Sequence, residues 1–281
     1  MMLKKLSLLL LFVGVTTASN AQIKTPQPSP ISKLEQVVGL TNVTLEYSRP
    51  GMKGRAVFGD LVPYDQTWRT GANANTKITF DTNVTIDGKE LQKGTYAIYS
   101  VPNKESWEII FYSDSNNSGL PKKWDDTKIA LKTTVEAVKM PVKIETFTMT
   151  FDDLTTKSGV LGILWENIYV GVKFEVPTDA LTTKSIETAM AGPSTNDYFQ
   201  AATYYHTEGK DLKQAFAWMQ KATAGENAPF WYLRRMSLIQ ADLGDKKGAI
   251  ASAQKSLTAA EKANNADYVK MNKESIAAWQ K

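Results

Sequence analysis

Cationic, aromatic and amide side chains are concentrated between residues 47 and 76, in the stretch YSRPGMKGRAVFG and its continuation DLVPYDQTWRTGANANT. Guanidinium groups bind carboxylates and phosphates through paired hydrogen bonds, and they also stack on planar groups. The set therefore predicts recognition of a small anionic or glycan ligand. The candidate ligand-binding residues are Arg49, Lys53, Arg55, Tyr64, Trp68, Arg69, Asn73 and Asn75.

A structural role for the same stretch is the alternative. A loop of this length is usually either functional or disordered, and Val57, Phe58 and Trp68 are apolar residues expected to pack rather than remain disordered. In the structural interpretation, the glycines serve turns and the arginines bind loop carbonyls or a strand carboxylate such as Glu46. The stretch is not a phosphate-binding P-loop, because it lacks the Gly-Lys-Ser/Thr ending and the helix that follows it.

Several catalytic chemistries are excluded by composition. The chain has no cysteine and one histidine, His206. A Cys-His nucleophilic site and a zinc site with two Cys or His ligands are therefore excluded. His206 lies inside a predicted helix, where we expect a surface residue near the helix end. The sequence indicates no catalytic residue, no metal site and no cofactor.

Carboxylate chemistry stays open, since two acidic side chains suffice to hydrolyse a glycoside. Spacing alone does not pair the acids of the first half across strands, and Asp152-Asp153 and Glu166-Asn167 are typical of hairpin turns. The segment DSNNSGLPKKWD resembles a calcium loop in part, but a strand precedes it and its last ligand is Asp125 rather than Glu. An ordinary turn is the favoured interpretation.

The elements that would position these residues change character along the chain. From Val43 to Val176 apolar residues recur at every second position, and Asp87-Gly88 marks a tight hairpin. A second hairpin is predicted around Pro102-Asn103-Lys104. About eight such strands without helical crossovers predict an antiparallel β-sandwich or open barrel over residues 22–178.

The second half predicts an all-α domain of tetratricopeptide-like helical hairpins over residues 183–281. AFAWMQKAT at Ala215 is echoed by AIASAQKSL at Ala249, an offset of 34 residues that is typical of tetratricopeptide repeats. The expected helices cover 196–208, 211–224, 229–243 and 246–262, with a closing helix after them. Helix pairs without repeat kinship are the alternative, because the consensus Trp-Leu-Gly is absent.

The first 21 residues are typical of a signal peptide. Lys4 and Lys5 precede an apolar run that ends at Val15, and small residues lead to a cleavage site near Ala21. Removal of both lysines lowers the Lys and Arg count from 33 to 31 against 29 Asp and Glu, so the net charge becomes +2. We therefore expect a periplasmic or secreted protein with no nucleic-acid partner and no membrane span in the mature chain.

Four segments together carry a family resemblance. They are VVGLTNVTLEYSRPGMKGRAVFG, LVPYDQTWRTGANANTKITF, KGTYAIYSVP and WEIIFY. In this order they closely resemble an exported bacterial family catalogued as domain of unknown function number 2911. The resemblance covers about residues 31–176, and the helical half is similar to the repeat-bearing C-terminus of some members. The family has no established activity, so the resemblance implies only that the loop residues are its hallmark.

Three functional hypotheses follow. The first is an exported binding or scaffold protein whose helical repeats bind a protein partner and whose β domain binds the anionic or glycan ligand. The second is a carboxylate-based glycan hydrolase of the cell envelope, which requires two acids in one cleft beside the arginine-bearing loop. The third is a purely structural envelope component, whose arginines would all be paired internally.

Overall fold

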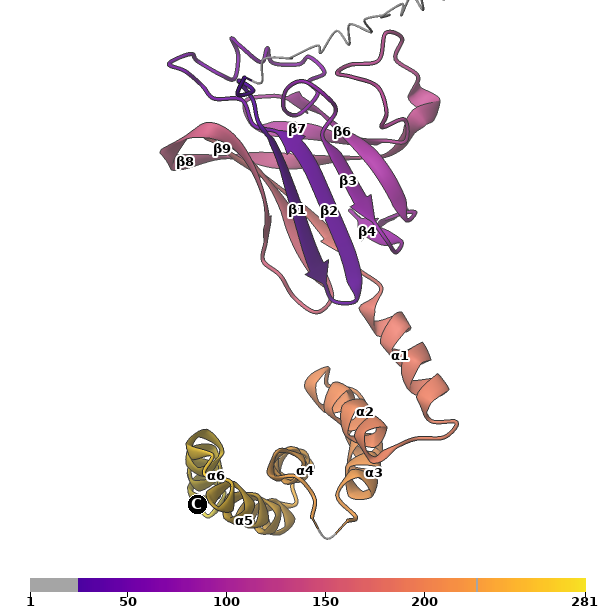
Figure 1. Ribbon diagram of the computed structural model, residues 1–281, viewed down its shortest axis with the longest axis vertical. Coiled ribbons are helices and arrows are strands. Elements are labelled where there is room, and N and C mark those ends of the chain that lie inside the picture. Colours follow the sequence, from indigo (N-terminus) through magenta and orange to yellow (C-terminus); the bar gives the residue numbers. More distant parts are fainter. Residues whose placement is uncertain (1–24, 226) are drawn as a thin grey trace, which may run out of the picture.

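The computed structural model describes residues 25–225 and 227–281, and it consists of a β-sheet followed by six α-helices. Figure 1 shows the strands at one end of the molecule and the helices at the other. The expected order of a β part before an α part is therefore confirmed. The expected signal peptide lies outside the described residues. No helix of the described part of the chain is long and apolar enough to cross a membrane.

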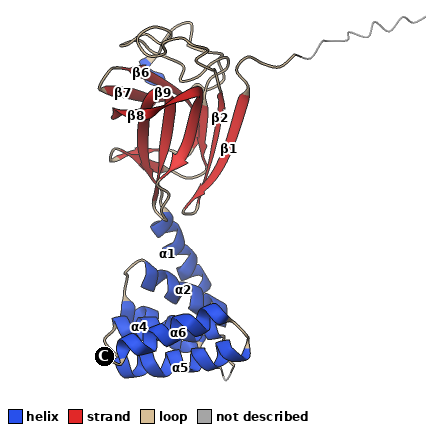
Figure 2. Ribbon diagram, turned by 90° about the vertical axis from the view of Figure 1, so that its left-hand side faces the viewer, coloured by secondary structure: helices blue, strands red, loops and turns tan. Residues whose placement is uncertain are grey.

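Nine strands form the β part. They are β1 (Ile31–Val38), β2 (Thr41–Ser48), β3 (Lys77–Phe80), β4 (Val84–Ile86), β5 (Lys89–Leu91), β6 (Gly94–Pro102), β7 (Ser106–Tyr112), β8 (Ile129–Asp152) and β9 (Ser158–Glu175). All the strand pairs are antiparallel, in the order β1-β2-β3-β6-β7-β8-β9-β4-β5. The sheet is open, with β1 and β5 at its edges, and Figure 2 shows its strands curving round one interior. The predicted antiparallel β class is therefore confirmed, and its strands form one open sheet rather than a closed barrel.

The long strand β8 joins strands β1, β2, β3, β6 and β7 on one side of the sheet to β9, β4 and β5 on the other. Its first residues pair with β7, as in Trp107 opposite Val135, and its later residues pair with β9, as in Met149 opposite Ile163. Two register shifts interrupt the pairing with β9. Such bulges bend a strand and increase its twist, so β8 turns the sheet around the core.

The core lies inside the curved sheet. Along β2 the alternate residues Val43, Leu45 and Tyr47 are buried, as period-two patterning requires, and Val172 and Phe174 of β9 belong to the same cluster. The tight turn at residues 87–88 is confirmed, because both of its residues have positive φ and join β4 to β5. The hairpin around residues 102–104 is also present, between β6 and β7.

The prediction of a hairpin turn at Glu166-Asn167 was wrong. Strand β9 continues through both residues, and Glu166 adopts a positive φ of 53° at one of the register shifts. An extra residue in one strand of a pair produces this conformation without ending the strand. Asp153, with a φ of 47°, does lie in the turn between β8 and β9.

Six helices follow the sheet. They are α1 (Thr178–Ala189), α2 (Thr195–Thr207), α3 (Leu212–Ala222), α4 (Phe230–Asp242), α5 (Lys246–Lys262) and α6 (Ala266–Trp279). The five expected helices correspond to α2 to α6 with small differences at their ends. Side-chain caps at Ser194, Asp211, Asp245 and Asn265 explain where four of them begin. Kinship with tetratricopeptide repeats stays a prediction.

Helix α1 was not predicted, and the expected boundary between residues 178 and 183 falls within it. His206 does lie near the end of α2, but the expectation of a surface side chain was wrong, since only 10% of it is exposed. Arg235 of α4 donates from Nη1 to His206 Nδ1 at 2.9 Å. Because a guanidinium only donates, Nδ1 accepts, and Nε2 carries the proton toward Asp242 at 2.8 Å. His206 therefore links α2 to α4.

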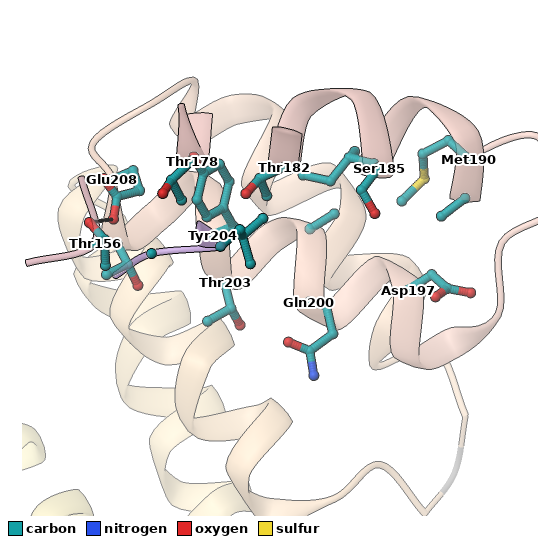
Figure 3. Close-up of a pocket in the computed structure, with 16 residues that line it drawn as sticks. Thr156, Thr178, Thr182, Ser185, Met190, Asp197, Gln200, Thr203, Tyr204 and Glu208 are labelled. Carbon is teal, nitrogen blue, oxygen red and sulfur yellow. Dashed lines mark hydrogen bonds between the residues drawn. The ribbon is translucent and has the colours of Figure 1, made fainter. Parts of the chain in front are cut away.

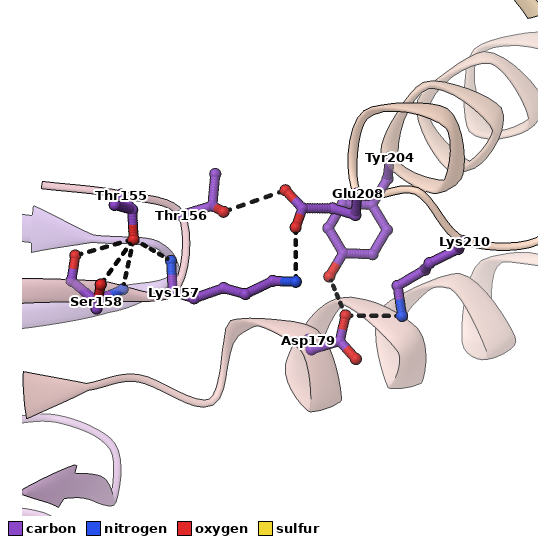
Figure 4. A network of polar contacts seen from close by, with 8 residues as sticks. All are labelled: Thr155, Thr156, Lys157, Ser158, Asp179, Tyr204, Glu208 and Lys210. Atoms are coloured by element: carbon purple, nitrogen blue, oxygen red, sulfur yellow. Dashed lines mark hydrogen bonds and ion pairs between the residues drawn. The ribbon is translucent and has the colours of Figure 1, made fainter. Parts of the chain in front are cut away.

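Two acidic residues hold the junction together: Glu208 joins the sheet to α2, and Asp179 joins α1 to α2 and the residues that follow it (Figure 4). Glu208, at the end of α2, accepts hydrogen bonds from Lys157 at 2.8 Å and Thr156 at 3.1 Å in the β8–β9 turn. Asp179 of α1 accepts from Lys210 and from the Tyr204 hydroxyl, both at 2.7 Å. Lys157 and Lys210 hold the pKa values of Glu208 and Asp179 below their usual range. Burial and the bond to Asp179 raise the pKa of Tyr204 to about 12.

A glycine allows close packing at this junction. Gly39, in the β1–β2 turn, has a φ of 56°, and a Cβ atom there would overlap Thr178 Oγ1 and the backbone oxygen of Thr156.

We expect Gly39→Ala to lower the free energy of unfolding by the cost of left-handed backbone, about 1–2 kcal/mol, and by about 1–3 kcal/mol more for the overlap. Urea titration measures the total change in the free energy of unfolding. Gly54→Ala is the matched control, because Gly54 has a φ of 74° and no atom within 4 Å of that position. Equal losses in the two variants would contradict the proposed close contact.

Candidate functional site

The arginine loop, residues 49–76, lies at the end of the sheet remote from the helices (Figure 1). Aromatic residues from several segments fix its course. The Trp68 ring stacks on Trp165 with centroids 5.9 Å apart, and Phe58 meets Trp107 edge to face at 4.9 Å. The backbone of Trp68 also exchanges two hydrogen bonds with Ser100 of β6, at 2.7 and 2.9 Å. The predicted packing of the loop is confirmed.

The loop arginines bind oxygen atoms of the protein itself. Arg49 donates from Nε to the carbonyl of Phe147 at 3.1 Å and from Nη2 to Thr148 Oγ1 at 2.8 Å. Arg55 donates to the carbonyls of residues 51 and 52, both at 2.8 Å. Arg69 is exposed and donates from Nη1 to the carbonyl of Asn73 at 3.3 Å. These contacts favour the structural alternative for Arg49 and Arg55, while ligand recognition by the loop stays a prediction.

The other candidate residues point to different surroundings. Asn75 is buried and donates to Asn117 Oδ1 at 2.9 Å, whereas Asn73 is exposed and donates to the carbonyl of Ser29 at 3.2 Å. The ring of Tyr64 lies against Gly59, and the Lys53 side chain is exposed. The eight residues are thus spread over the loop rather than gathered around one cavity.

One cleft beside the loop does combine acidic and basic side chains. It has a volume of about 400 Å³, and its charged lining residues are Arg55, Lys143, Glu145 and Glu166. Of the eight candidates, Arg55 is the one that lines it. Both carboxylates also hold the loop: Glu145 accepts from the backbone nitrogen of Lys53 at 2.8 Å, and Glu166 accepts from those of residues 57 and 58 at 3.3 and 3.4 Å.

Sequence reasoning missed Lys143 and Glu145 as site residues. Both lie in the part of β8 where the register shifts, and Glu145 is next to Ile144, which pairs with Glu166. Alternating residues of a regular strand point to opposite faces, so spacing alone gave no reason to place Glu145 and Glu166 in one cleft. The period-two pattern does indicate that each acid lies in or beside a strand, but it does not show where a bulge shifts the pairing of the two strands.

The segment that resembled a calcium loop contains ordinary turns. Asp125 caps a short 3-10 helix at Asp126–Lys128, and Asp114 accepts from the backbone of Asn116 at 3.5 Å. Asn117 donates to the carbonyl of Gly119 at 2.8 Å. Within residues 25–225 and 227–281 there is no group of three or more His, Cys, Asp or Glu side chains arranged to hold a metal ion.

The contacts of Arg49 give a direct test of the structural role of the loop. Arg49→Met removes two hydrogen bonds from a partly buried guanidinium. We expect a loss of about 1.5–3 kcal/mol in the free energy of unfolding, since such bonds are charge-assisted. Lys53→Met, in the same loop but exposed, is expected to change it by less than about 0.5 kcal/mol. Denaturant titration measures both values, and an Arg49 variant as stable as the Lys53 variant would contradict the structural role.

Comparison with known proteins places the β part in a family. No curated protein and no solved structure matches the chain. A family model described as "Protein of unknown function (DUF2911)" matches residues 29–174, more than half of the chain, and the match includes all of the arginine loop and both carboxylates of the cleft. The chain therefore belongs to the DUF2911 family of proteins of unknown function.

Proposed function

We propose that this protein is an exported binding or scaffold protein that engages a protein partner through its helical domain. One face of α4 carries the proposal. Trp231 is 43% exposed, and Arg234 and Arg235 follow it by three and four residues. Residues at these spacings are neighbours on a helix surface. Tryptophan and arginine are enriched among the residues that dominate binding energy at protein interfaces.

Trp231 and the charge behind it define the partner. Arg235 is bound to His206 of α2, and the Nη1 atom of Arg234 is buried, so a partner does not contact these groups directly. Burial lowers the pKa values of Arg234 and Arg235, which means that their surroundings compensate the positive charges incompletely. A partner segment with an apolar side chain against Trp231 and an acidic group nearby would complement the ring and this positive potential. An array of stacked helices commonly offers such extended binding surfaces.

The β domain has a second role in this proposal. Its arginine loop is held by internal hydrogen bonds and aromatic packing, so it is a preformed surface. The cleft lined by Arg55 and Lys143 is the place where a small anionic or glycan ligand would find cations. Export to the periplasm or beyond the cell accompanies this function in the proposal, on the basis of the signal-peptide pattern.

The partner-binding proposal is tested by pull-down from the cell envelope. The wild-type chain should retain a specific protein, and Trp231→Ala or Arg234→Gln should reduce its recovery about tenfold, the effect of losing about 1.4 kcal/mol. Leu154→Ala is the matched control, because Leu154 is 45% exposed but lies in the β8–β9 turn. Equal recovery by all four proteins would reject the α4 face.

A carboxylate-based glycan hydrolase is the second candidate. The observation in its favour is that Glu145 and Glu166 line one cleft beside the arginine loop. Two carboxylates flanking a glycosidic bond supply the acid and the base or nucleophile of hydrolysis. Against it, one oxygen of each carboxylate accepts backbone hydrogen bonds from the loop.

Release of reducing sugar from cell-wall glycan tests this candidate. If the protein is a hydrolase, Glu145→Gln and Glu166→Gln should each lower the rate at least about a hundredfold, as loss of a general acid or base does. Glu108→Gln is the control, since Glu108 pairs with Lys132 on β8, away from the residues that line the cleft. No release by the wild type, or equal rates in all three variants, would reject hydrolysis at this cleft.

A further inference from the structure

A second cavity lies where the sheet meets the helices. Its volume is about 490 Å³, and its walls come from α1, α2, the β1–β2 turn and the β8–β9 turn. Figure 3 shows Ser185 of α1 and Met190, the residue after that helix, facing the gap between α1 and α2. Cavities of about 300–1,000 Å³ hold small organic molecules in proteins. This cavity is separate from the α4 face and from the cleft beside the arginine loop.

The walls of this junction cavity are mostly apolar. Leu40, Ile186, Met190 and Ala201 contribute carbon surface from three different segments. Threonine and serine side chains, for example Thr182, add neutral hydroxyl groups between them. An apolar wall with a few neutral hydrogen-bonding groups is typical of sites that bind largely apolar molecules.

The charges at the cavity have one sign. Asp197 and Glu208 line it, and no lysine or arginine of the described chain does. A hydrogen bond from Lys157 lowers the pKa of Glu208, and hydrogen bonds from Ser194 lower that of Asp197, so both stay ionised at neutral pH. Glu208 is already paired with Lys157, and Asp197 with the Ser194 cap, so the described residues of the wall leave no cation for an anionic ligand such as a fatty-acid carboxylate. A neutral ligand needs no such cation.

The hydroxyl groups of the wall add a second argument. Thr182 and Ser185 of α1 line the cavity, and Ser185 is exposed. The buried hydroxyl of Thr178 packs against Gly39 of the β1–β2 turn instead, so a bound molecule does not reach it. A hydroxyl or carbonyl oxygen of a ligand would find hydrogen-bonding groups at Thr182 and Ser185. The chemistry of the wall therefore favours an uncharged ligand with one or two oxygen atoms.

We propose that the cavity between α1, α2 and the sheet binds a neutral, largely apolar small molecule that carries a hydroxyl or carbonyl group. The ligand touches both the sheet turns and the first two helices, because residues of all four segments line the site. Its binding thus adds to the contacts by which Glu208 joins the sheet to α2 and Asp179 joins α1 to α2.

The test uses Nile red, a neutral apolar dye, and the full mature chain. The dye should bind with increased fluorescence, and decan-1-ol should displace it at lower concentration than decanoate, its anionic counterpart of equal chain length. Ser185→Trp fills the cavity from an exposed position and should weaken dye binding about tenfold or more, equivalent to about 1.4 kcal/mol. Glu187→Trp is the matched control, since Glu187 is exposed on the same helix and does not line the cavity.

A second measurement needs no variant. In the wild-type chain, decan-1-ol should shift the methyl NMR signal of Met190, which lines the cavity, and leave that of Met149 in the β core unchanged. Absence of dye binding, equal binding by the two tryptophan variants, or equal displacement by decanoate would overturn the proposal. An unshifted Met190 signal would overturn it even if Ser185→Trp failed to fold.

Discussion

The antiparallel pairing of β8 with β9 is the interaction on which the rest of the structure depends. This ribbon carries Phe147 and Trp165 under the arginine loop, where Trp68 packs against both. At its other end, the turn between the strands presents Lys157 to Glu208 of the helical part. The chain has no cysteine, so no disulfide secures these contacts. Backbone pairing and burial must hold both ends of the molecule, and one ribbon serves both.

The loop that this ribbon supports explains why Arg49 and Arg55, which the sequence suggested as ligand-binding residues, donate hydrogen bonds to oxygen atoms of the protein itself. A long loop leaves many backbone carbonyls without strand partners, and buried carbonyls need donors. Arg49 supplies two hydrogen bonds to β8, and Arg55 supplies two to the loop itself. The two bonds of Arg49 are partly buried, which strengthens them relative to bonds in water. Two of the arginines that the sequence suggested for ligand recognition, Arg49 and Arg55, are therefore residues that help to fold this loop.

Much of the architecture was predictable because its signals are local. Hydrophobic period two indicated the strands, and capping residues such as Asp211 and Asn265 marked where helices begin. Helix α1 escaped prediction because its threonine-rich sequence has no clear apolar stripe. Its residues form a helix whose first residue, Thr178, packs against Gly39 of the β1–β2 turn. Contacts of that kind override weak local propensity.

The sites were harder to predict because each depends on contacts that are remote in sequence. Arg49 meets Phe147 across 98 residues, and Glu145 reaches the cleft with Glu166 only because the β8–β9 register shifts there. The junction cavity joins Leu40 to Ile186 and so needs the whole fold before it exists. A pattern in the sequence reveals residues that can do chemistry, whereas their partners are set by strand register and by packing between domains. For this protein the decisive physical question at each site is therefore which oxygen or nitrogen atoms the fold has already paired, since only the remainder is available to a ligand.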